Sequence, residues 1–542
     1  MNNPLPLTDL TVPSLLARQA RERGGKTCLT ELATMRRWTY GELEAWTGRI
    51  AGALATQGVA HGTHVGILME NSAEHLALFL ALARLGAVAV PVNTAARGEL
   101  LGYYLLQADV ALIVADAALL ERLAPVLPGL PLVDRVLAVS PVGSTVAAPD
   151  RLAGKPVIDF AAAVRAASAA ALQREIKCTD LVLLSYTSGT SGPSKPSMWS
   201  QAAALSYGTG GIEAHGFLDT DIVYVCLPLF HNNALLTGSI TALVAGGSIV
   251  LSERFSVSRF WLEIRSSGAT VTNMLGSMTS FLWAQPPMPD DADNALRLVS
   301  MSPIPSFVDG FERRFGLRAI SNYGLSDFAT VTSLAADAPA AKRMSIGKPR
   351  SYYEVQVVDD DDLPCPAGVT GELVIRTREP WRAATGYYRM PQATAAANRN
   401  QWFHTGDRGY RDADGYFWFV DRKKDCIRRR GENISAFEVE QILLKHPDIA
   451  NAAVFPVSLP EGEEEVGAVL VLRAGRAVSE ALVIAYCAQN MAYFMVPRFV
   501  RIAGELPTTV NQKVEKFRLK AAMETQLPSV WDREQHGIVL KR

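Results

Sequence analysis

The loop at residues 188–195, SGTSGPSK, brings hydroxyl side chains, two glycines and Lys195 together directly after the apolar run LVLLSY at residues 181–186. Glycines let a backbone approach oxygen atoms closely, and hydroxyl, amide and ammonium groups donate hydrogen bonds to phosphate oxygens. The spacing differs from G-x-x-x-x-G-K-[ST], and an ordinary flexible Ser/Gly loop is the alternative. The candidate phosphate-binding residues are Thr187, Ser188, Gly189, Thr190, Ser191 and Lys195.

Two further segments end in a carboxylate. NYGLSD at residues 322–327 supplies an aromatic ring, a hydroxyl and Asp327, and WFHTGD at residues 402–407 is a turn that ends in Asp407. A carboxylate accepts two hydrogen bonds at once, which suits the vicinal hydroxyls of a ribose. A phosphate-type loop together with these segments predicts a nucleotide site.

These loops need a framework that brings distant segments together, and the hydrophobic pattern indicates one. An amphipathic stretch at residues 73–85 lies between two short apolar runs, which predicts a strand, a helix and a strand. The apolar runs of this kind are at residues 63–69, 87–93, 108–114, 181–186, 221–227 and 248–251. Repetition of this unit predicts parallel layers, so the expected fold class is α/β.

The pattern changes after Pro349. Short strands separated by Gly, Asp and Pro turns predict a β-rich subdomain at about residues 350–421, and a highly charged stretch begins at Arg422. We expect a large N-terminal domain at residues 1–421 and a small α+β C-terminal domain at residues 422–542. The small domain is long enough to fold alone and to rotate as a rigid body.

Length and composition limit the remaining possibilities. The 542 residues exceed one hydrophobic core, and a net charge of -1 with 49% apolar residues favours neither disorder nor a polyanion-binding surface. The six cysteines and eight histidines lack zinc or disulfide spacings, so any metal should arrive with a phosphate ligand. Because neither a signal peptide nor a membrane span is visible, we expect a cytoplasmic protein with small-molecule partners and no nucleic acid.

Five segments occur in one order along the chain: SGTSGPSKPS, NYGLSD, WFHTGD, DRKKD at residues 421–425 and NQKVEK at residues 511–516. In this order they resemble the motifs of the adenylate-forming superfamily, which includes acyl-CoA synthetases, adenylation domains and beetle luciferases. The resemblance spans about residues 30–520. It implies that a carboxylate attacks the α-phosphate of MgATP with loss of pyrophosphate, and that a thiol then captures the acyl adenylate. The implied cofactors are ATP, Mg²⁺ and coenzyme A, and the small domain is implied to rotate between the steps.

The resemblance also implies roles for single residues at the nucleotide. The loop at residues 188–195 would hold the β and γ phosphates, Tyr323 would stack on adenine, and Ser326 would touch phosphate. Asp407 would bind both ribose hydroxyls, and Asp327 stands where the family has a magnesium-associated glutamate. The other implied nucleotide contacts are Ser302, Asn322, Gly324 and Arg422.

Two lysines are implied to act in the catalytic cycle. Lys424 occupies the family's hinge position, and Lys513 matches the mobile lysine that bridges the carboxylate and the α-phosphate. A cation placed where negative charge develops stabilises the transition state by several kcal/mol in a closed site. A solvated residue in the segment KVEKFRLK is the alternative for Lys513.

For the thiol step, the loop RRRGEN at residues 428–433 resembles the family's loop along the pantetheine tunnel, where a glycine avoids an obstructing Cβ. A solvated basic turn is the alternative for its arginines. The implied coenzyme A contacts are Arg429, Arg430, Gly431, Glu432, Phe494 and Arg498. Coenzyme A and the phosphopantetheine of a carrier protein are chemically alike, so either thiol remains open.

For the acid, the segment LPLFH at residues 227–231 resembles the loop at the carboxylate entrance, which makes His231 a candidate to contact or gate the acyl group. A lone histidine is otherwise more often structural. The implied pocket wall includes Asn233, Met274, Gly276, Ser277 and Pro303. The small residues in this wall predict a roomy, fairly apolar acid site.

Three departures from the family pattern cluster around the nucleotide. Pro196 follows the loop lysine where relatives continue into glycine, so one backbone donor is lost. SMSP at residues 300–303 replaces a segment that is richer in glycine, and Asp327 is one methylene shorter than glutamate. Each lost charge-assisted hydrogen bond costs roughly 1.5 to 3 kcal/mol. These changes could therefore slow adenylation while the thiol step survives.

The leading prediction is an acyl-CoA ligase acting on an apolar, cyclic or medium-length carboxylic acid. One alternative is an adenylation-impaired enzyme that mainly converts a preformed acyl adenylate, and a second is a stand-alone enzyme that loads a carrier protein. A third is a non-catalytic adenylate-binding protein. A luciferase-like oxygenase shares the same fold, since function resides in the site. The acid, the pathway and the oligomeric state remain open.

Overall fold

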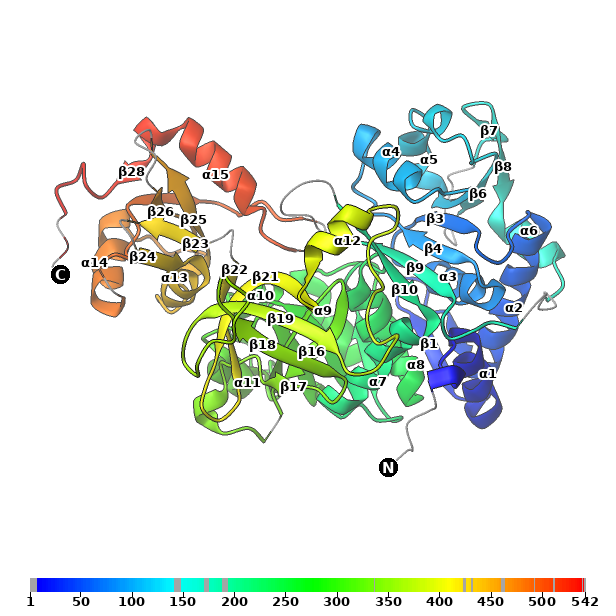
Figure 1. Ribbon diagram of the computed structural model, residues 1–542, viewed down its shortest axis with the longest axis horizontal. Coiled ribbons are helices and arrows are strands. Elements are labelled where there is room, and N and C mark those ends of the chain that lie inside the picture. Colours follow the sequence, from blue (N-terminus) through cyan, green and yellow to red (C-terminus); the bar gives the residue numbers. More distant parts are fainter. Residues whose placement is uncertain are drawn as a thin grey trace.

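The computed structural model describes residues 7–140, 148–169, 175–187, 194–335, 337–422, 426–429, 432–459, 464–491, 493–509, 512–538 and 540. Figure 1 shows a large N-terminal domain, which carries most of the sheets and helices, and a small C-terminal domain beside it. The predicted α/β fold class is confirmed. Among the residues described, none of the helices combines the length and the apolar character that crossing a bilayer requires.

A nine-stranded sheet forms one half of the large domain. It is parallel across its middle, from β1 to β15, and antiparallel at both edges. In spatial order its strands are β17 (Lys348–Pro349), β16 (Phe328–Ser333), β15 (Arg318–Leu325), β14 (Leu298–Ser302), β13 (Val271–Leu275), β11 (Ile222–Val225), β12 (Ser248–Leu251), β1 (Thr27–Glu31) and β2 (Arg37–Thr39).

An eight-stranded sheet forms the other half and is also parallel except at its edges. Its strands are β10 (Pro196–Ser200), β9 (Leu181–Tyr186), β4 (Val88–Pro91), β3 (His64–Leu68), β5 (Leu112–Asp116), β6 (Val136–Val139), β8 (Lys155–Asp159) and β7 (Arg151–Leu152). The predicted strand at residues 181–186 coincides with β9. The run predicted at residues 108–114 forms its strand later, because residues 108–110 complete the turn after the preceding helix.

Helices cover both sheets and join them through one apolar core. The core includes side chains of α1, α2, α3, α7 and α8 together with strands of both sheets. Helix α2 begins in a capping box, in which Thr39 and Glu42 each accept a hydrogen bond from the backbone of the other. The helices of the large domain are α1 (Val12–Arg23), α2 (Tyr40–Thr56), α3 (Ala73–Leu85), α4 (Gly98–Gln107), α5 (Leu120–Leu123), α6 (Phe160–Ala166), α7 (Gln201–His215), the π-helical segment η4 (Asn233–Ile240), α8 (Thr241–Ala245), α9 (Val257–Ser267), α10 (Gly276–Trp283), α11 (Val308–Phe315) and α12 (Pro391–Ala397).

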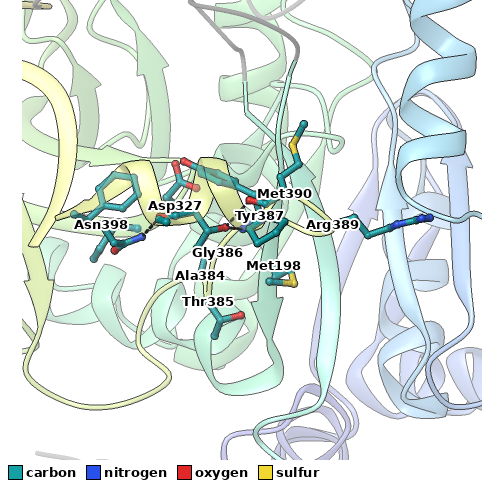
Figure 2. Close-up of a pocket in the computed structure, with 14 residues that line it drawn as sticks. Met198, Asp327, Ala384, Thr385, Gly386, Tyr387, Arg389, Met390 and Asn398 are labelled. Carbon is teal, nitrogen blue, oxygen red and sulfur yellow. Dashed lines mark hydrogen bonds between the residues drawn. The ribbon is translucent and has the colours of Figure 1, made fainter. Parts of the chain in front are cut away.

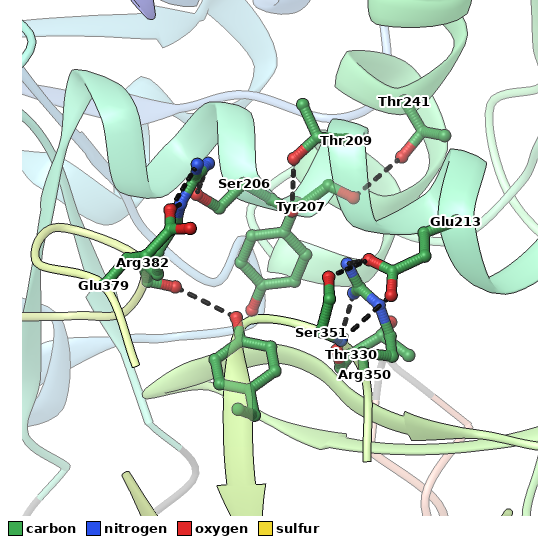
Figure 3. A network of polar contacts seen from close by, with 11 residues as sticks. Ser206, Tyr207, Thr209, Glu213, Thr241, Thr330, Arg350, Ser351, Glu379 and Arg382 are labelled. Atoms are coloured by element: carbon green, nitrogen blue, oxygen red, sulfur yellow. Dashed lines mark hydrogen bonds and ion pairs between the residues drawn. The ribbon is translucent and has the colours of Figure 1, made fainter. Parts of the chain in front are cut away.

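A polar network fastens α7 to the strands beside the predicted site (Figure 3). Arg350 donates a 2.7 Å hydrogen bond to the carbonyl oxygen of Thr330 and lies 3.2 Å from a carboxylate oxygen of Glu213. A Cβ on Gly210 would lie 2.0 Å from Nη1 of Arg350, so the glycine makes room for the buried guanidinium. The network ties β16 to the core helix behind it.

The segment predicted to be rich in β-strands contains an antiparallel sheet of five strands. These strands are β18 (Tyr353–Val358), β19 (Gly371–Thr377), β20 (Asn398–Arg399), β21 (Trp402–Arg411) and β22 (Phe417–Arg422). The boundary predicted at residue 422 falls at the end of β22. The predicted hinge, Lys424, lies outside the described residues.

In the small domain, alternate residues of β25 and β26 enter two apolar clusters, as expected for a sheet that is covered on both faces. Its strands are β23 (Cys426–Arg429), β24 (Glu432–Ser435), β25 (Ile449–Ser458), β26 (Glu464–Leu472), β27 (Phe499–Ala503) and β28 (Trp531–Asp532). Its helices are α13 (Ala436–Leu443), α14 (Glu480–Asn490) and α15 (Lys516–Thr525).

Candidate active site

Tyr323 and Asp407 lie far apart in sequence and meet in the structure. Tyr323 is near the end of β15, in the nine-stranded sheet, and Asp407 is on β21, in the five-stranded sheet. The hydroxyl of Tyr323 donates a hydrogen bond to Oδ2 of Asp407 over 2.7 Å, and both residues are 8% exposed. The predicted adenine and ribose residues therefore lie side by side where these two sheets meet.

Asn322, the residue before Tyr323, is oriented by three polar neighbours. Ser302 Oγ donates to Oδ1 of Asn322 over 2.8 Å, and Nδ2 of Asn322 contacts Ser300 Oγ and, at 3.2 Å, Nε2 of His215. Burial lowers the pKa of His215 to about 3, with the nearby charge of Arg350 acting in the same direction. The imidazole is therefore neutral. The two serines that replace the more glycine-rich pattern thus hold Asn322 in place.

Gly324 lies near the end of β15, and Ser326 and Asp327 form the turn between β15 and β16. A Cβ on Gly324 would lie 2.6 Å from the carbonyl oxygen of Ala329, so the irregular pairing of these strands requires glycine. Asn232 donates from Nδ2 to the carbonyl oxygen of Ser326 over 3.3 Å. This contact ties the turn to the loop that follows β11.

Residues 188–193 of the predicted phosphate loop lie outside the described residues, but both ends of the loop are described. The amide of Thr187 donates to the carbonyl oxygen of Lys195 over 3.0 Å, which closes the loop at its base. Tyr103, on α4, donates from its hydroxyl to the carbonyl oxygen of Ser194 over 2.8 Å, and the hydroxyl of Tyr104 lies 3.3 Å from Ser194 Oγ. Two tyrosines therefore support the C-terminal stem of the loop.

Pro196 is the first residue of β10, the outermost strand of the eight-stranded sheet. It is paired with Tyr186 of β9, and its carbonyl oxygen accepts a 2.8 Å hydrogen bond from the amide of Tyr388. Proline is tolerated at the start of an edge strand because few ladder hydrogen bonds need its missing N–H. The fold therefore accommodates this departure from the family pattern.

Asp327 borders a cavity of about 610 Å³ (Figure 2). Ser197 donates from Oγ to Oδ1 of Asp327 over 2.9 Å. Burial raises the pKa of Asp327 to about 6, and the hydroxyl groups of Ser197 and Tyr387 oppose this shift. Nζ of Lys195 lies 5.1 Å from the centre of the Tyr387 ring.

Two residues of the predicted acid wall touch each other. A Cβ on Gly276 would lie 3.2 Å from Cδ of Pro303, because the carboxyl ends of β13 and β14 bring Leu275 opposite Ser302. Ser277 follows Gly276 in the first turn of α10, and Met274 is buried at the end of β13. The predicted wall residues therefore converge at one edge of the sheet.

The loop after β11 carries His231 and Asn233. The ring of His231 lies against Phe230, with ring centres 4.5 Å apart. Oδ1 of Asn233 and Oδ1 of Asn273 are buried, and neither accepts a hydrogen bond from any residue that the structure describes. Both asparagines line a cavity of about 10 Å³, which has room for about one water molecule. Two buried amide oxygens therefore lie in a cavity whose other lining residues are mostly apolar.

The small domain contacts the acid wall through the segment that contains Lys513. Ser277 donates from Oγ to the carbonyl oxygen of Gln512, the residue directly before Lys513. A second contact between the domains is the 2.8 Å hydrogen bond from the amide of Ser306 to Oε1 of Gln441. The predicted catalytic lysine therefore follows a residue that is docked on the predicted acid pocket.

Comparison with known proteins decides the family. Residues 16–388 match the family described as AMP-binding enzyme, and residues 438–513 match the AMP-binding enzyme C-terminal domain. The chain is an AMP-binding enzyme. The resemblance to the adenylate-forming superfamily inferred from the five motifs is therefore confirmed.

Relatives of this AMP-binding enzyme cover nearly its whole length. A crotonobetaine/carnitine–CoA ligase of Salmonella paratyphi A is 31% identical over 493 residues, which are 90% of this chain and 93% of the relative. The structure of ATP-bound MatB from Rhodopseudomonas palustris has a TM-score of 0.83 at 26% identity and covers 95% of this chain and 99% of its own. An anthranilate CoA ligase in complex with anthranoyl-AMP has a TM-score of 0.87 and covers 97% and 99%. Its identity of 24% supports the fold alone.

Two of the predicted coenzyme A residues of this AMP-binding enzyme, Arg429 and Arg498, form ion pairs within the small domain. Nε of Arg429 lies 2.6 Å from Oε2 of Glu465, and Nη1 donates to the carbonyl oxygen of Phe494 over 3.0 Å. Arg498 lies 3.1 Å from Asp532. Arg430 and Gly431 lie outside the described residues, as do the side chains of Arg422 and Glu432.

Four site residues of the AMP-binding enzyme were not singled out from the sequence: Tyr103, Ser197, Asn273 and Tyr387. Ser197 had a usable signal, because it lies two residues after Lys195 in an extended segment and so shares its face. Asn273 had a weaker signal, as a polar residue in an otherwise buried strand. Tyr103 and Tyr387 reach the loop only through tertiary packing, which no local pattern reveals.

Proposed function

We propose that this AMP-binding enzyme is an acyl-CoA ligase, which activates a carboxylic acid as its adenylate and passes the acyl group to the thiol of coenzyme A. The observation that carries the proposal is the contact between Gln512 and Ser277, because it brings the Lys513 segment to the acid wall. The 31% identical Salmonella relative, itself a CoA ligase, supports the same reaction class.

In the first step, a carboxylate oxygen of the acid bonds to the α-phosphorus of ATP, and the bond from that phosphorus to the β-phosphate oxygen breaks. Pyrophosphate leaves with this electron pair. We assign Asp407 to the ribose hydroxyls and the ring of Tyr323 to adenine, in line with their contact at 2.7 Å. We assign Lys513 to the negative charge that develops between the acid and the α-phosphate, where a fixed cation acts most strongly.

In the second step, the sulfur of coenzyme A attacks the carbonyl carbon of the acyl adenylate, the thiol loses its proton, and AMP leaves with the electrons of the broken C–O bond. With Gln512 docked on Ser277, the Lys513 segment lies against the acid wall. A thiol needs access to the same carbon, so we infer that the small domain withdraws between the steps. The predicted pivot is Lys424.

The acid is proposed to have an apolar body that carries at least one hydrogen-bond donor. Met274, Gly276 and Pro303 favour the apolar body, and the buried amide oxygens of Asn233 and Asn273 favour the donor. Carnitine, which the name of the 31% identical relative includes, carries a hydroxyl group that is a hydrogen-bond donor. The sequence predicted a fairly apolar acid, and this proposal adds a hydrogen-bond donor to that acid.

A second candidate is an enzyme in which adenylation is slow and the thiol step is intact. The arrangement of Asp327 favours it, because this carboxylate is buried against Ser197 and Tyr387 on the nucleotide side of the site. Magnesium is proposed to enter with the phosphates of ATP.

The test measures each half-reaction by itself. Purified enzyme is given MgATP, coenzyme A and a panel of aromatic, hydroxylated, amino- and unsubstituted aliphatic acids, and acyl-CoA is detected by mass spectrometry. Synthetic acyl adenylates with coenzyme A or with a holo-carrier protein test the thiol step. We expect acyl-CoA from at least one acid with release of AMP and pyrophosphate. Activity from adenylates alone favours the second candidate, and no thioester from either route refutes both.

A further inference from the structure

We propose that Asp327 is not a magnesium ligand but the anchor of a clamp, formed with Ser197, Tyr387 and Lys195, that positions the phosphate loop for adenylation. The inference rests on the proposed function, since the loop is taken to bind the triphosphate of ATP. It departs from what the family resemblance implies for this position. Asp327, Ser197 and Tyr387 are positioning residues in this proposal.

The surroundings of Asp327 do not fit a magnesium site. Magnesium prefers six oxygen ligands in octahedral geometry and keeps several waters, which requires an accessible carboxylate. Asp327 is 8% exposed, and its Oδ1 already accepts a hydrogen bond from Ser197.

The same contacts do fit an anchor between three segments of the chain. Ser197 belongs to β10, which continues directly from the phosphate loop, and Asp327 belongs to the turn after β15. The amide of Ala384 donates to the carbonyl oxygen of Asp327 over 3.0 Å, and the amide of Met198 donates to the carbonyl oxygen of Gly386 over 2.9 Å. Residues 385–388 therefore run beside β10, where Tyr387 forms an antiparallel bridge with Ser197, and Asp327 contacts this pair through its backbone and its side chain (Figure 2).

The contacts of the clamp residues depend on one another. Ser197 is fully buried, so its hydroxyl would lose its acceptor if Asp327 turned toward a metal ion. Tyr387 links the carboxylate with the loop, because its hydroxyl group favours the charged form of Asp327 and its ring centre lies 5.1 Å from Nζ of Lys195. A cation over an aromatic face is attracted by the ring quadrupole. The clamp thus fixes the position of the lysine at the end of the phosphate loop.

The chemical consequence is confined to one half of the reaction. The β and γ phosphates are present only until pyrophosphate leaves, so a misplaced Lys195 should impair adenylation and spare the thiol step. A general loss of structure would impair both. This difference separates a positioning role from a merely structural one.

The experiment compares Ser197→Ala and Tyr387→Phe with Tyr388→Phe, a matched control whose hydroxyl contacts Asp109 instead. Pyrophosphate exchange and thioesterification of a preformed adenylate are measured for each variant. We expect the first two variants to raise the KM for ATP in exchange about tenfold or more, because one hydrogen bond to a charged group corresponds to roughly one to two decades. Thioesterification should stay within about twofold. Equal losses in both half-reactions, or no loss in exchange, would overturn the clamp.

Two substitutions at Asp327 test the metal alternative directly. Asp327→Asn keeps the size and an acceptor for Ser197, so the magnesium concentration that gives half-maximal exchange should change by less than about twofold. Asp327→Glu restores the family's longer carboxylate but moves it past Ser197 and Tyr387 by one methylene, so exchange should slow and the thermal midpoint should fall. A tenfold higher magnesium requirement in Asp327→Asn, or faster exchange in Asp327→Glu, would show that Asp327 holds the metal.

A binding measurement, which does not require catalytic turnover, tests the role of Asp327 separately from the proposed acyl-CoA ligase activity. Binding of Mn²⁺ to the enzyme with a non-hydrolysable ATP analogue, followed by electron paramagnetic resonance, should give the same affinity for wild type and Asp327→Asn. A tenfold weaker affinity in the variant would refute the clamp. If no acid is activated at all, the proposed function fails, while this measurement and the thermal midpoints still decide the role of Asp327.

Discussion

The hydroxyl of Tyr323 donates a 2.7 Å hydrogen bond to Oδ2 of Asp407, so the residue proposed to stack on adenine also orients the carboxylate proposed to bind the ribose. Ribose is present in ATP and in the acyl adenylate, and Asp407 should therefore serve both half-reactions. We predict that Asp407→Asn slows pyrophosphate exchange and thioesterification alike, each by roughly 10- to 100-fold, since hydrogen bonds to a charged acceptor are worth about 1.5 to 3 kcal/mol.

Tyr323→Phe is the companion variant. It keeps the aromatic ring and removes only the bond to Asp407, so its effect on both half-reactions should be smaller than that of Asp407→Asn. A defect of Asp407→Asn confined to one half-reaction would contradict the assignment of Asp407 to the ribose.

Lys513 should be needed for only one of the two steps. Gln512 is docked on Ser277, and the charge that Lys513 is proposed to stabilise develops during adenylation. We predict that Lys513→Ala lowers pyrophosphate exchange by about 100-fold or more, in the range found when an electrostatic contact to a transition state is removed. Thioesterification of a preformed adenylate should change little. Lys520→Ala, which removes a lysine paired on α15 with Glu524, is the matched control and should leave both steps within about twofold.

The buried amide oxygen of Asn273, beside the acid wall, should make the enzyme discriminate between acids with and without a hydrogen-bond donor. Oδ1 of Asn273 is buried and accepts no hydrogen bond from the described residues, so a donor on the acid can satisfy it and a methyl group cannot. We predict that Asn273→Leu lowers kcat/KM for hydroxylated or amino acids of the panel about tenfold relative to unsubstituted acids of equal size. A uniform change for both kinds of acid would show that Asn273 only shapes the fold or holds a water molecule.

The sequence predicted the elements well and the contacts between them less well. The run at residues 181–186 forms β9, and the segments with Tyr323 and Asp407 meet as the five motifs implied. These predictions succeeded because strand periodicity and motif residues are local properties of the chain. The nucleotide, acid and coenzyme A roles of single residues stay predictions.

Asp327 and Arg429 show that local sequence patterns do not predict the contacts of a side chain. Whether a carboxylate faces a ligand or a buried serine depends on segments far away in the chain, here residues 384–388 for Asp327. Whether an arginine faces a phosphate or a glutamate depends in the same way on Glu465 for Arg429. Packing of distant segments determines which side chains become partners. These partners therefore cannot be predicted from local patterns in a single sequence.

Arg429 is predicted to act on stability more than on coenzyme A binding. It is 5% exposed and lies 2.6 Å from the buried Glu465, and removing one partner of a buried ion pair typically costs about 3 to 5 kcal/mol. Arg429→Gln should therefore lower the thermal midpoint of the enzyme by several degrees, whereas Arg473→Gln, on the same domain, should lower it less. If Arg429→Gln instead raises the KM for coenzyme A at an unchanged thermal midpoint, the role implied by the family resemblance is correct.

Asp116 should make the stability of the large domain depend on pH. Burial raises its pKa to about 7, although the amide of Glu70 donates a 2.8 Å hydrogen bond that favours the charged form. The unfolded carboxyl titrates near 3.8, so between about pH 4 and pH 7 the folded state binds more protons than the unfolded state, and stability falls as the pH rises through this window.

We predict that Asp116→Asn, which keeps the size and an acceptor for Glu70, gains thermal midpoint over wild type progressively from pH 4 to pH 7. The full difference is a few kcal/mol at most, because one pKa unit corresponds to about 1.4 kcal/mol. Asp361→Asn, at an exposed turn, is the control, and a pH-independent difference between Asp116→Asn and wild type would mean that the carboxyl of Asp116 titrates normally.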